Sequence, residues 1–145
     1  MNIKHKTVIL GIIENTQDQI LMTQRLDPKI QDAHMKWDIV GGTKRNKESE
    51  IRTLKRECIE ETGYKINIHK KLPKEIIKKW KHTDYTLYVD IRCFHCNVLQ
   101  KTIDKTTDKR INKIEWKPRE EILSLDLLPT TRELIKYFFE HSVSI

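Results

Sequence analysis

Three glutamates, at positions 57, 60 and 61, have a spacing that could bind a divalent metal ion. Offsets of three and four residues return to the same side of an α-helix, so these carboxylates would share one face. Their mutual repulsion costs roughly a few tenths of a kcal/mol per pair, and Arg56 can neutralise only part of the cluster. Carboxylate oxygens gathered on a rigid element are ligands that Mg²⁺ or Mn²⁺ prefers. A solvated acidic helix face is the alternative reading of the three residues alone.

The surrounding residues predict the helix that must position these glutamates, with a length of about four turns. Asn46 can cap its N-terminus, with Glu48 in the first turn, where the helix dipole favours an anion. Gly63 suits the left-handed residue just past its end. An apolar stripe about a quarter-turn from the glutamates is expected to be buried, and it consists of Ile51, Leu54 and Cys58.

The stretch from Gly42 to Tyr64 resembles the Nudix box, the signature of the Nudix hydrolases. It reads GTKRNKESEIRTLKRECIEETGY, with Glu48 six positions after the glycine and RECIEETGY following seven residues later. Cys58 and Tyr64 fill its hydrophobic slots. Seven fixed residue types at fixed spacing are expected by chance in roughly one in a million chains of this length.

The resemblance implies roles for individual residues of the motif. Glu57 and Glu61 correspond to direct metal ligands, and Glu60 is a ligand in some relatives. The backbone carbonyl of Gly41 often joins the metal ion as well. The remaining roles are supporting ones, in which Arg56 orients Glu57 by a charge-assisted hydrogen bond, Glu48 supports the cluster directly or through water, and Gly42 lets the backbone approach closely.

The resemblance also implies a reaction, the hydrolysis of a phosphoanhydride bond with Mg²⁺ or Mn²⁺ as cofactor. In some relatives Glu57 is the proposed general base, and in others it is an acidic residue of a later loop. Asp104 and Asp108 are the loop candidates in this chain, while Glu115 and Glu120 are less well placed. The sequence leaves this choice open.

Length and composition are those of one globular domain spanning residues 1–145. Hydrophobic residues make up 37% and charged residues 34%, a polar balance that still allows a core. The net charge of +7 favours an anionic partner. Three cysteines, an odd number, argue against a disulfide framework and predict a reducing cytoplasm. No apolar run reaches the roughly 20 residues of a membrane span, and the N-terminus is not a convincing signal peptide.

The first part of the chain predicts a β-hairpin made of residues 7–14 and 19–25, joined by a polar turn. Arg25 closes the second strand, and the resemblance makes it a candidate to bind a substrate phosphate, although a surface arginine is an equal alternative. Trp37, just before the motif, is interpreted as a packing residue rather than a base-stacking one.

Residues 66–81 carry six lysines, which usually means a solvated face. Contact with a polyphosphate or an RNA 5′ end is the alternative, in which Trp80 would stack on a base.

Residues 83–99 give the strongest strand signal, with apolar side chains on both faces, as in a central strand. Asp90 and Arg92 interrupt one face, and they need either each other, another structural partner or a substrate. We retain Arg92 as a substrate-binding candidate. Cys93 and Cys96 invite a metal-site interpretation, but positions three apart on a strand point to opposite faces.

The last third predicts a polar loop, a short strand at residues 111–116, a small helix starting at Pro118 and a final helix from residue 130 to 141. Together with the resemblance, this order indicates an α+β fold, a Nudix-like α/β/α sandwich with a mixed central β-sheet. In the branch that removes oxidised nucleotides, the segment entering the last helix can supply base-reading carboxylates, and here Asp126 lies only just before that segment.

The favoured function is a metal-dependent pyrophosphohydrolase that acts on a nucleoside triphosphate or on a nucleoside diphosphate linked to another moiety. The alternatives are an RNA 5′-end pyrophosphohydrolase and a non-catalytic nucleotide-sensing domain. Homodimers are common in the family that the motif resembles.

Overall fold

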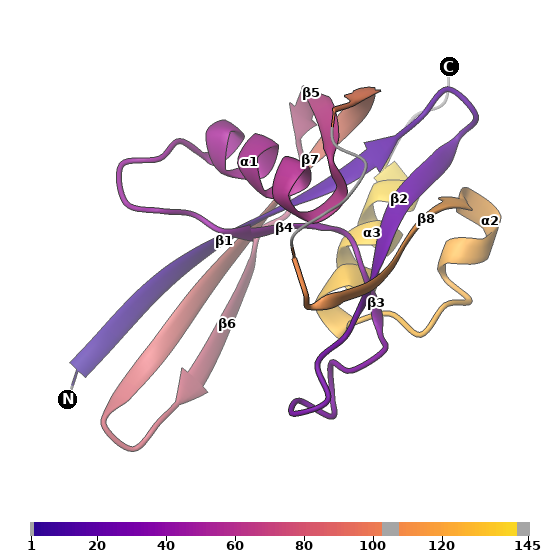
Figure 1. The fold of residues 1–145 in the computed structure, drawn as a ribbon. Coiled ribbons are helices and arrows are strands. Elements are labelled where there is room, and N and C mark those ends of the chain that lie inside the picture. The colour runs from indigo at the N-terminus through magenta and orange to yellow at the C-terminus, as the bar shows by residue number, and fades with distance from the viewer. Residues whose placement is uncertain (1, 103–107, 142–145) are drawn as a thin grey trace.

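The computed structural model describes residues 2–102 and 108–141. Figure 1 shows a long twisted sheet with one helix on one side and two helices on the other. The elements in chain order are β1 (Asn2–Glu14), β2 (Gln19–Arg25), β3 (Trp37–Asp38), β4 (Val40–Thr43), α1 (Glu50–Thr62), β5 (Tyr64–Lys71), β6 (Ile76–Lys81), β7 (Tyr85–Lys101), β8 (Ile111–Pro118), α2 (Arg119–Ile122) and α3 (Pro129–His141).

The eight described strands form one mixed sheet in which β3, β2, β1, β7 and β5 are neighbours in that order. Strands β4, β6 and β8 pair with β1, β7 and β2 respectively. The β1–β7 pairing is parallel and runs from Asn2↔Tyr85 to Glu14↔Asn97, whereas the other pairs are antiparallel. The prediction of a central strand covered on both faces is confirmed for β7.

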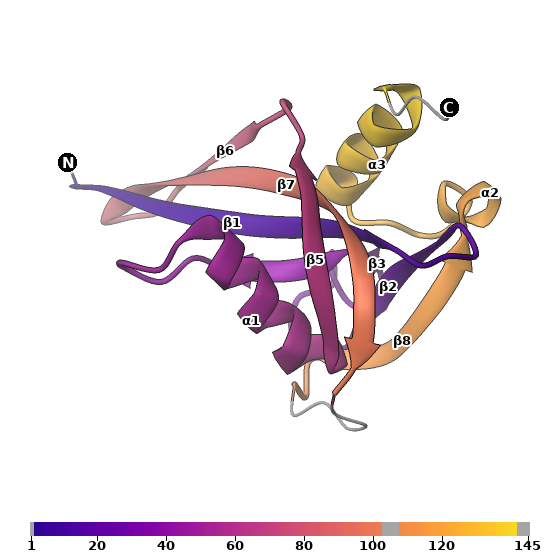
Figure 2. The same ribbon diagram turned by 90° about the horizontal axis from the view of Figure 1, so that it is seen from above.

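Two apolar clusters lie on the two faces of this sheet, as the alternation of side chains along a strand requires. On one face, Leu54 and Cys58 of α1 pack with residues such as Phe94. On the other, α3 packs with residues such as Ile91. Figure 2 shows α1 and α3 on opposite sides of β1 and β7, so the predicted α/β/α sandwich with a mixed sheet is confirmed.

The two strand cysteines separate in the same way. Cys93 belongs to the cluster under α3 and Cys96 to the cluster under α1, so their predicted opposite orientation is confirmed. Both thiols are buried, and burial raises the pKa of Cys96 to about 12. Neither is therefore a reactive thiolate.

Strand β1 begins at Asn2 rather than at the predicted Thr7, because its first residues extend the pairing with β7. The predicted hairpin forms only at its base, where Glu14 pairs with Ile20 and the Asn15 side chain accepts hydrogen bonds from two turn amides. We call residues 2–6 of β1, strand β6 and residues 85–90 of β7 the basic ribbon. Figures 1 and 2 show the basic ribbon projecting beyond the helices.

Helix α1 starts later than expected. Ser49, not Asn46, is its N-cap, and its hydroxyl accepts a hydrogen bond from the Arg52 amide. Lys47 has a positive φ of 67°, so the helix can begin only after this residue. Glu48 consequently precedes the helix, and Glu50 is the acidic residue of the first turn. The predicted C-terminal cap is confirmed, since Gly63 is left-handed with a φ of 78°.

The buried face of α1 is also rotated from the predicted one. Leu54 and Cys58 are buried, but Ile51 is 43% exposed. Three polar residues, Thr53, Glu61 and Thr62, are buried instead, which moves the buried face toward the side that carries Glu61. A search for apolar periodicity misses such positions, because polar side chains can be buried when their polar atoms are hydrogen-bonded.

Strand β2 and helix α3 are close to expectation, since β2 covers residues 19–25 and α3 begins at Pro129. Leu134, Ile135 and Phe138 of α3 are buried. Trp37 is 8% exposed within the same core cluster, which confirms its interpretation as a packing residue. No helix in the described part of the chain is long and apolar enough to cross a membrane.

Candidate active site

A polar cleft of about 410 Å³ lies where strands β1 to β4 meet the C-terminal half of α1 and residues 108–111. Its acidic lining residues are Asp38, Glu57, Glu61 and Asp108, and its basic ones are Lys6, Arg25 and Arg110. Carboxylates and cations from five separate segments therefore face one cavity. This arrangement can hold a metal cation and a phosphate chain together.

Arg56 does not line the cleft, but it donates hydrogen bonds to several carboxylates next to it. Its Nε and Nη2 donate to the two oxygens of Glu48 at 2.8 and 3.0 Å, a bidentate pair. Its Nη1 donates to Glu57 Oε1 at 2.9 Å and to Glu60 Oε2 at 3.3 Å, and Nη2 also reaches the Thr43 carbonyl. The hydrogen bonds to Glu48 are the main reason that the pKa of Arg56 rises and that of Glu48 falls. Arg56 is therefore a fixed cation that positions other side chains.

Glu57 lies directly against the backbone of β4. A methyl group built on Gly42 would be 2.4 Å from the Glu57 carboxyl carbon, so only glycine leaves room for this carboxylate. Burial raises the pKa of Glu57 and outweighs the opposing effect of Arg56. The carboxylate thus has a fixed place and a charge that would be stabilised by a further cation.

Glu61 is the most buried of the three glutamates, with an exposure of 8%. The Gly41 amide donates a hydrogen bond to its Oε1 at 3.1 Å. Burial raises the pKa of Glu61 well above its ordinary value, and the nearby charges of Asp38, Glu57 and Asp108 act in the same direction. A cation bound between these carboxylates would remove this repulsion.

The donor set fits Mg²⁺ or Mn²⁺ as an ion shared with a substrate. Within residues 2–102 and 108–141, no three acidic, histidine or cysteine side chains converge closely enough to hold a metal ion alone. Mg²⁺ commonly uses only one or two carboxylates and completes its shell with waters and substrate phosphates. Glu57 and Glu61 supply two such carboxylates, while a role for the Gly41 carbonyl stays a prediction.

Glu60 differs from its two neighbours because its side chain is 46% exposed and does not line the cleft. Its contact with Arg56 places it at the outer edge of the cluster. The ligand role that the resemblance allows for Glu60 would require this side chain to turn inward.

Arg25 lines the cleft beside Asp38, with 4.0 Å between Arg25 Nη1 and Asp38 Oδ2. Its Nε is buried, and no atom of the described residues accepts a hydrogen bond from it. A buried donor without an acceptor is costly, so a substrate oxygen would be a favourable partner. Arg25 therefore stays a candidate substrate-binding residue.

Arg92 is not in the cleft. Its Nη1 pairs with Glu50 of α1, and its other nitrogens approach Glu75 and Asp90 at 3.4 and 3.9 Å. The structural pairing considered for Asp90 and Arg92 is thus the one present. The geometry gives no support to substrate binding by Arg92, because its guanidinium is already paired with Glu50, and this ion pair links β7 to α1.

Asp38 and Arg110 are cleft residues that the sequence did not single out. Asp38 accepts hydrogen bonds from the Thr131 hydroxyl and the Ile39 amide, and burial raises its pKa. Arg110 donates from its backbone amide and Nε to Asp108 Oδ1 at 3.0 and 3.2 Å. Burial opposes ionisation of Asp108, but these hydrogen bonds lower its pKa overall. No local pattern marks either residue, because strand pairing and the approach of residues 108–111 bring them to the cleft.

The other candidates for the general base are placed unequally. Asp108 lines the cleft, whereas Asp104 lies outside the described residues. Glu115 is paired with Lys117 at 2.7 Å, and neither Glu115 nor Glu120 lines the cleft. Glu57 and Asp108 are therefore the described candidates that face the cleft.

Comparison with known proteins identifies the family. Residues 4–138 match the model of the NUDIX domain, so the chain belongs to this family. Membership makes it a Nudix-type hydrolase of phosphoanhydride bonds. A search of curated proteins gave no match.

Solved structures share the fold. A NUDIX hydrolase from Nitrosomonas europaea aligns with a TM-score of 0.73 and 20% identity, covering 94% of this chain and 90% of its own. The MutT protein from Methanosarcina mazei Go1 aligns at 0.70 and 19%, covering 97% and 96%. The E. coli ORF135 protein aligns at 0.70 and 22%, covering 95% and 91%. At these identities the likeness concerns the fold.

Proposed function

We propose that this protein is a metal-dependent pyrophosphohydrolase that cleaves a nucleoside triphosphate or a nucleoside diphosphate linked to another moiety. The observation that carries the proposal is the pair Glu57 and Glu61, two carboxylates held against β4 at the wall of a cleft that also presents cations. Buried or half-buried carboxylates that share a cleft with more exposed cations suit a substrate that brings both negative phosphates and a divalent metal ion.

The residues of the chain have separable roles in this reaction. Glu57 and Glu61 would hold Mg²⁺ or Mn²⁺, which when bound neutralises phosphate oxygens and makes water more acidic. Arg25, Lys6 and Arg110 would bind the phosphate chain. A water oxygen attacks one phosphorus, the bond to the bridging oxygen breaks, and the second phosphate group leaves with that oxygen.

The proton of the attacking water goes to a carboxylate that faces the cleft. Glu57 and Asp108 both fulfil the requirement of position, and the choice between them stays open. Arg56 does not touch the substrate in this scheme. It keeps Glu57 in a single orientation through the rigid connection to Glu48.

Substitution of Glu61 by Gln tests the proposal. Gln keeps the shape and the hydrogen bond from Gly41 but removes the charge, so Mg²⁺-dependent turnover should fall at least about a hundredfold, or about 2.7 kcal/mol. Glu121→Gln, at an exposed position of α2, is the matched control. Unchanged turnover by Glu61→Gln, with a native circular dichroism spectrum, would refute the metal assignment.

The substrate class is tested with a nucleotide panel that compares nucleoside triphosphates with dinucleoside polyphosphates and nucleoside diphosphate sugars. Hydrolysis in ¹⁸O-labelled water, followed by mass spectrometry, identifies the phosphorus that water attacks. Asp126 is 72% exposed and paired with Lys36 at 3.2 Å, outside the cleft lining, so it adds no support for an oxidised purine.

A second candidate substrate is a triphosphorylated RNA 5′ end, and the basic ribbon favours it. Lys4 and Lys6 alternate with His5 along β1, and the ladder of β1, β7 and β6 places Lys78 and Trp80 on the same face as those lysines. Lys6 itself lines the cleft. One face of the basic ribbon therefore continues from the cleft, with lysines for phosphates and an exposed indole for a base.

The strand alternation of β6 supplies a test with an internal control. Lys78 is on the cleft-side face, whereas Lys79 is on the other face, with its Nζ 5.7 Å from the Tyr88 ring centre. If RNA is the substrate, Lys78→Ala should reduce kcat/KM for a triphosphorylated 10-nucleotide RNA more than Lys79→Ala does. Equal effects of both variants, or faster hydrolysis of a mononucleotide than of RNA, would exclude the RNA candidate.

A further inference from the structure

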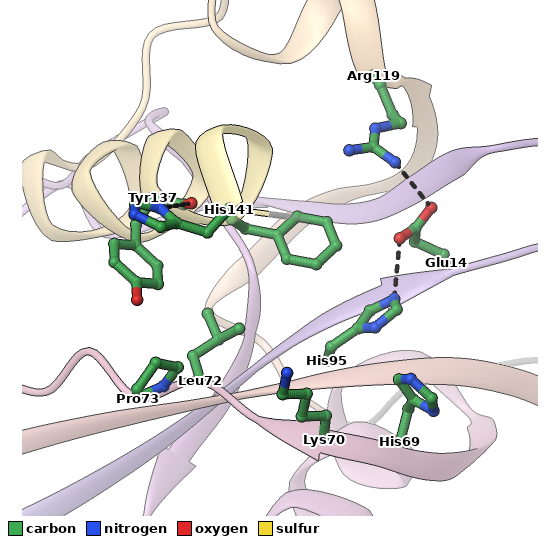
Figure 3. A pocket seen from close by; sticks show the side chains of 10 residues that line it. Glu14, His69, Lys70, Leu72, Pro73, His95, Arg119, Tyr137 and His141 are labelled. Atoms are coloured by element: carbon green, nitrogen blue, oxygen red, sulfur yellow. Dashed lines mark hydrogen bonds and ion pairs between the residues drawn. The ribbon is translucent and has the colours of Figure 1, made fainter. Parts of the chain in front are cut away.

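A second cavity, of about 470 Å³, lies on the α3 side of the sheet and shares no lining residue with the active-site cleft. Figure 3 shows it between the C-terminal half of α3 and the strands that carry His69, Lys70 and His95. Its volume falls within the roughly 300–1,000 Å³ of small-molecule sites. We call it the α3 cavity.

A β-bulge in β5 places two consecutive polar residues on the wall of the α3 cavity. Ile68 pairs with Cys96 and Lys70 with His95, so His69 is an extra residue opposite the regular ladder. In a regular strand, consecutive side chains point to opposite faces. Here His69 and Lys70 both line the cavity, and the His69 ring meets the His95 ring edge to face at 5.3 Å. Bulges often reorient side chains in this way at functional sites.

The one carboxylate of the cavity wall is already neutralised. Glu14 Oε1 lies 2.9 Å from His95 Nε2, and Glu14 Oε2 lies 3.7 Å from Arg119 Nη1. The hydrogen bond with His95 is the main reason that the pKa of Glu14 is lowered, so this group is an anion at neutral pH. The Arg119 guanidinium is further fixed over the Phe138 and Phe139 rings.

The ammonium group of Lys70 is not paired with the carboxylate of the cavity wall. It has no ion-pair partner within residues 2–102 and 108–141. Figure 3 shows its side chain directed into the space below α3. The remaining wall near it is apolar or aromatic and includes Leu72, Pro73 and Tyr137. The cavity therefore combines an unused ammonium group and an imidazole with a surface for an uncharged ring.

We propose that the α3 cavity is a binding site for a nucleoside monophosphate, with its phosphate at Lys70 and His69 and its base and sugar against Leu72, Pro73 and Tyr137. A phosphomonoester carries close to two negative charges at pH 7, which suits two adjacent donors. The choice of a nucleotide rests on the proposed function, because cleavage of a nucleotide anhydride releases phosphomonoesters. The protein would thus bind its own class of product at a second place.

Binding is tested by titrating the ¹⁵N-labelled full chain with AMP without metal ions and following amide chemical shifts. We expect shifts at His69, Lys70 and His95 that persist when a non-hydrolysable nucleotide triphosphate analogue and Mg²⁺ saturate the active-site cleft. Lys70→Ala should weaken AMP binding at this site about tenfold. Lys65→Ala removes another exposed lysine of the same strand, one that does not line the cavity, and should change AMP binding less than about twofold.

Two further ligands separate the parts of the proposal. Adenosine should bind much more weakly than AMP, and equal binding would overturn the anion assignment. Inorganic phosphate should also bind more weakly, and equal binding would overturn the contact with the nucleoside. Absence of shifts at the three amides, or equal behaviour of the two lysine variants, would overturn the site itself.

These outcomes are independent of catalysis. AMP binding in the α3 cavity of a chain that hydrolyses no nucleotide would refute the proposed function and retain the site. Normal hydrolysis without AMP binding there would do the reverse.

Discussion

The guanidinium of Arg56 donates a 2.9 Å hydrogen bond to Glu57, its immediate neighbour in α1. Consecutive helical residues point about 100° apart and do not normally meet. The contact exists because Glu48, from the loop before the helix, binds two other nitrogens of Arg56 and holds the plane of the guanidinium. Orientation of a candidate metal ligand thus depends on a residue nine positions earlier.

Arg56→Lys should lower turnover about 10- to 100-fold while leaving the fold intact. Lysine keeps the positive charge but cannot bind Glu48 with two nitrogens and Glu57 with a third. Steady-state kinetics over a range of Mg²⁺ concentrations measures the effect, and Arg52→Lys on the exposed side of the same helix is the control. Equal activity of both variants would show that charge alone suffices at position 56.

Gly42→Ala should reduce activity at least about tenfold with little loss of stability. The added methyl group would lie 2.4 Å from the carboxyl carbon of Glu57, and the end of a flexible side chain moves away more easily than backbone does. The melting temperature should therefore fall by no more than about 5 °C, which corresponds to roughly 1 kcal/mol.

Gly11→Ala should have the opposite effect and lower stability more than activity. There the methyl group would meet Leu54 side-chain atoms at 3.1 Å in the core under α1. Overpacking should lower stability by about 1–3 kcal/mol with smaller loss of activity per folded molecule. Similar activity losses in both glycine variants would contradict a specific role for the space beside Glu57.

Arg25→Lys should raise KM about tenfold or more and change kcat less. The buried Nε of Arg25 is a donor that lysine lacks, and a charge-assisted hydrogen bond to a phosphate is worth about 1.5–3 kcal/mol. The comparison variant is Arg45→Lys, which changes an exposed arginine outside the cleft lining. A fall in kcat with KM unchanged would indicate instead that Arg25 contacts only the transition state.

Glu14→Gln should lower the free energy of unfolding at pH 7 by about 1–2 kcal/mol, because it replaces a carboxylate that hydrogen-bonds to His95 and pairs with Arg119 by a neutral amide. The folded-state pKa of Glu14 lies below its ordinary value of 4.5. Its stabilising contribution is therefore complete above that value and is lost as the pH falls through the folded-state pKa.

The difference between wild type and Glu14→Gln should accordingly shrink on acidification from about pH 6 to pH 3. Urea unfolding at several pH values measures it, with Glu121→Gln as the control for loss of an exposed carboxylate. A difference that stays constant over this range would contradict the ionic role of Glu14.

Much of the layout was predictable because local patterns determine it. The polar turn after residue 14 marked the start of β2, two-sided apolar character placed β7 inside the sheet, and Gly63 marked the end of α1. The start of α1 was not predictable in this way. Asn46 and Ser49 are both good capping residues, and the choice depends on the backbone of Lys47 and on the hydrogen bonds that side chains of the helix donate to Glu48.

The candidate site was predictable only in its helical part. Helical spacing brings Glu57 and Glu61 together, but the same spacing gave no sign that Glu60 would be exposed. Asp38 reaches the cleft through the pairing of β3 with β2, and Arg110 through a segment some 70 residues further on. Such residues carry no local signal, because the relation that defines them is a tertiary one.

The parallel pairing of β1 with β7 also constrains how the chain is made and folded. Every partner in this ladder is about 80 residues further along, so the edge of β1 that pairs with β7 has no partner while the intervening chain is being synthesised. At about 5–20 residues per second, the apolar segment of β1 waits roughly 4–16 s on the ribosome before β7 is complete. During this interval β1 can pair with β4 but keeps one strand edge open, and we expect chaperones that shield nascent chains to contact that edge.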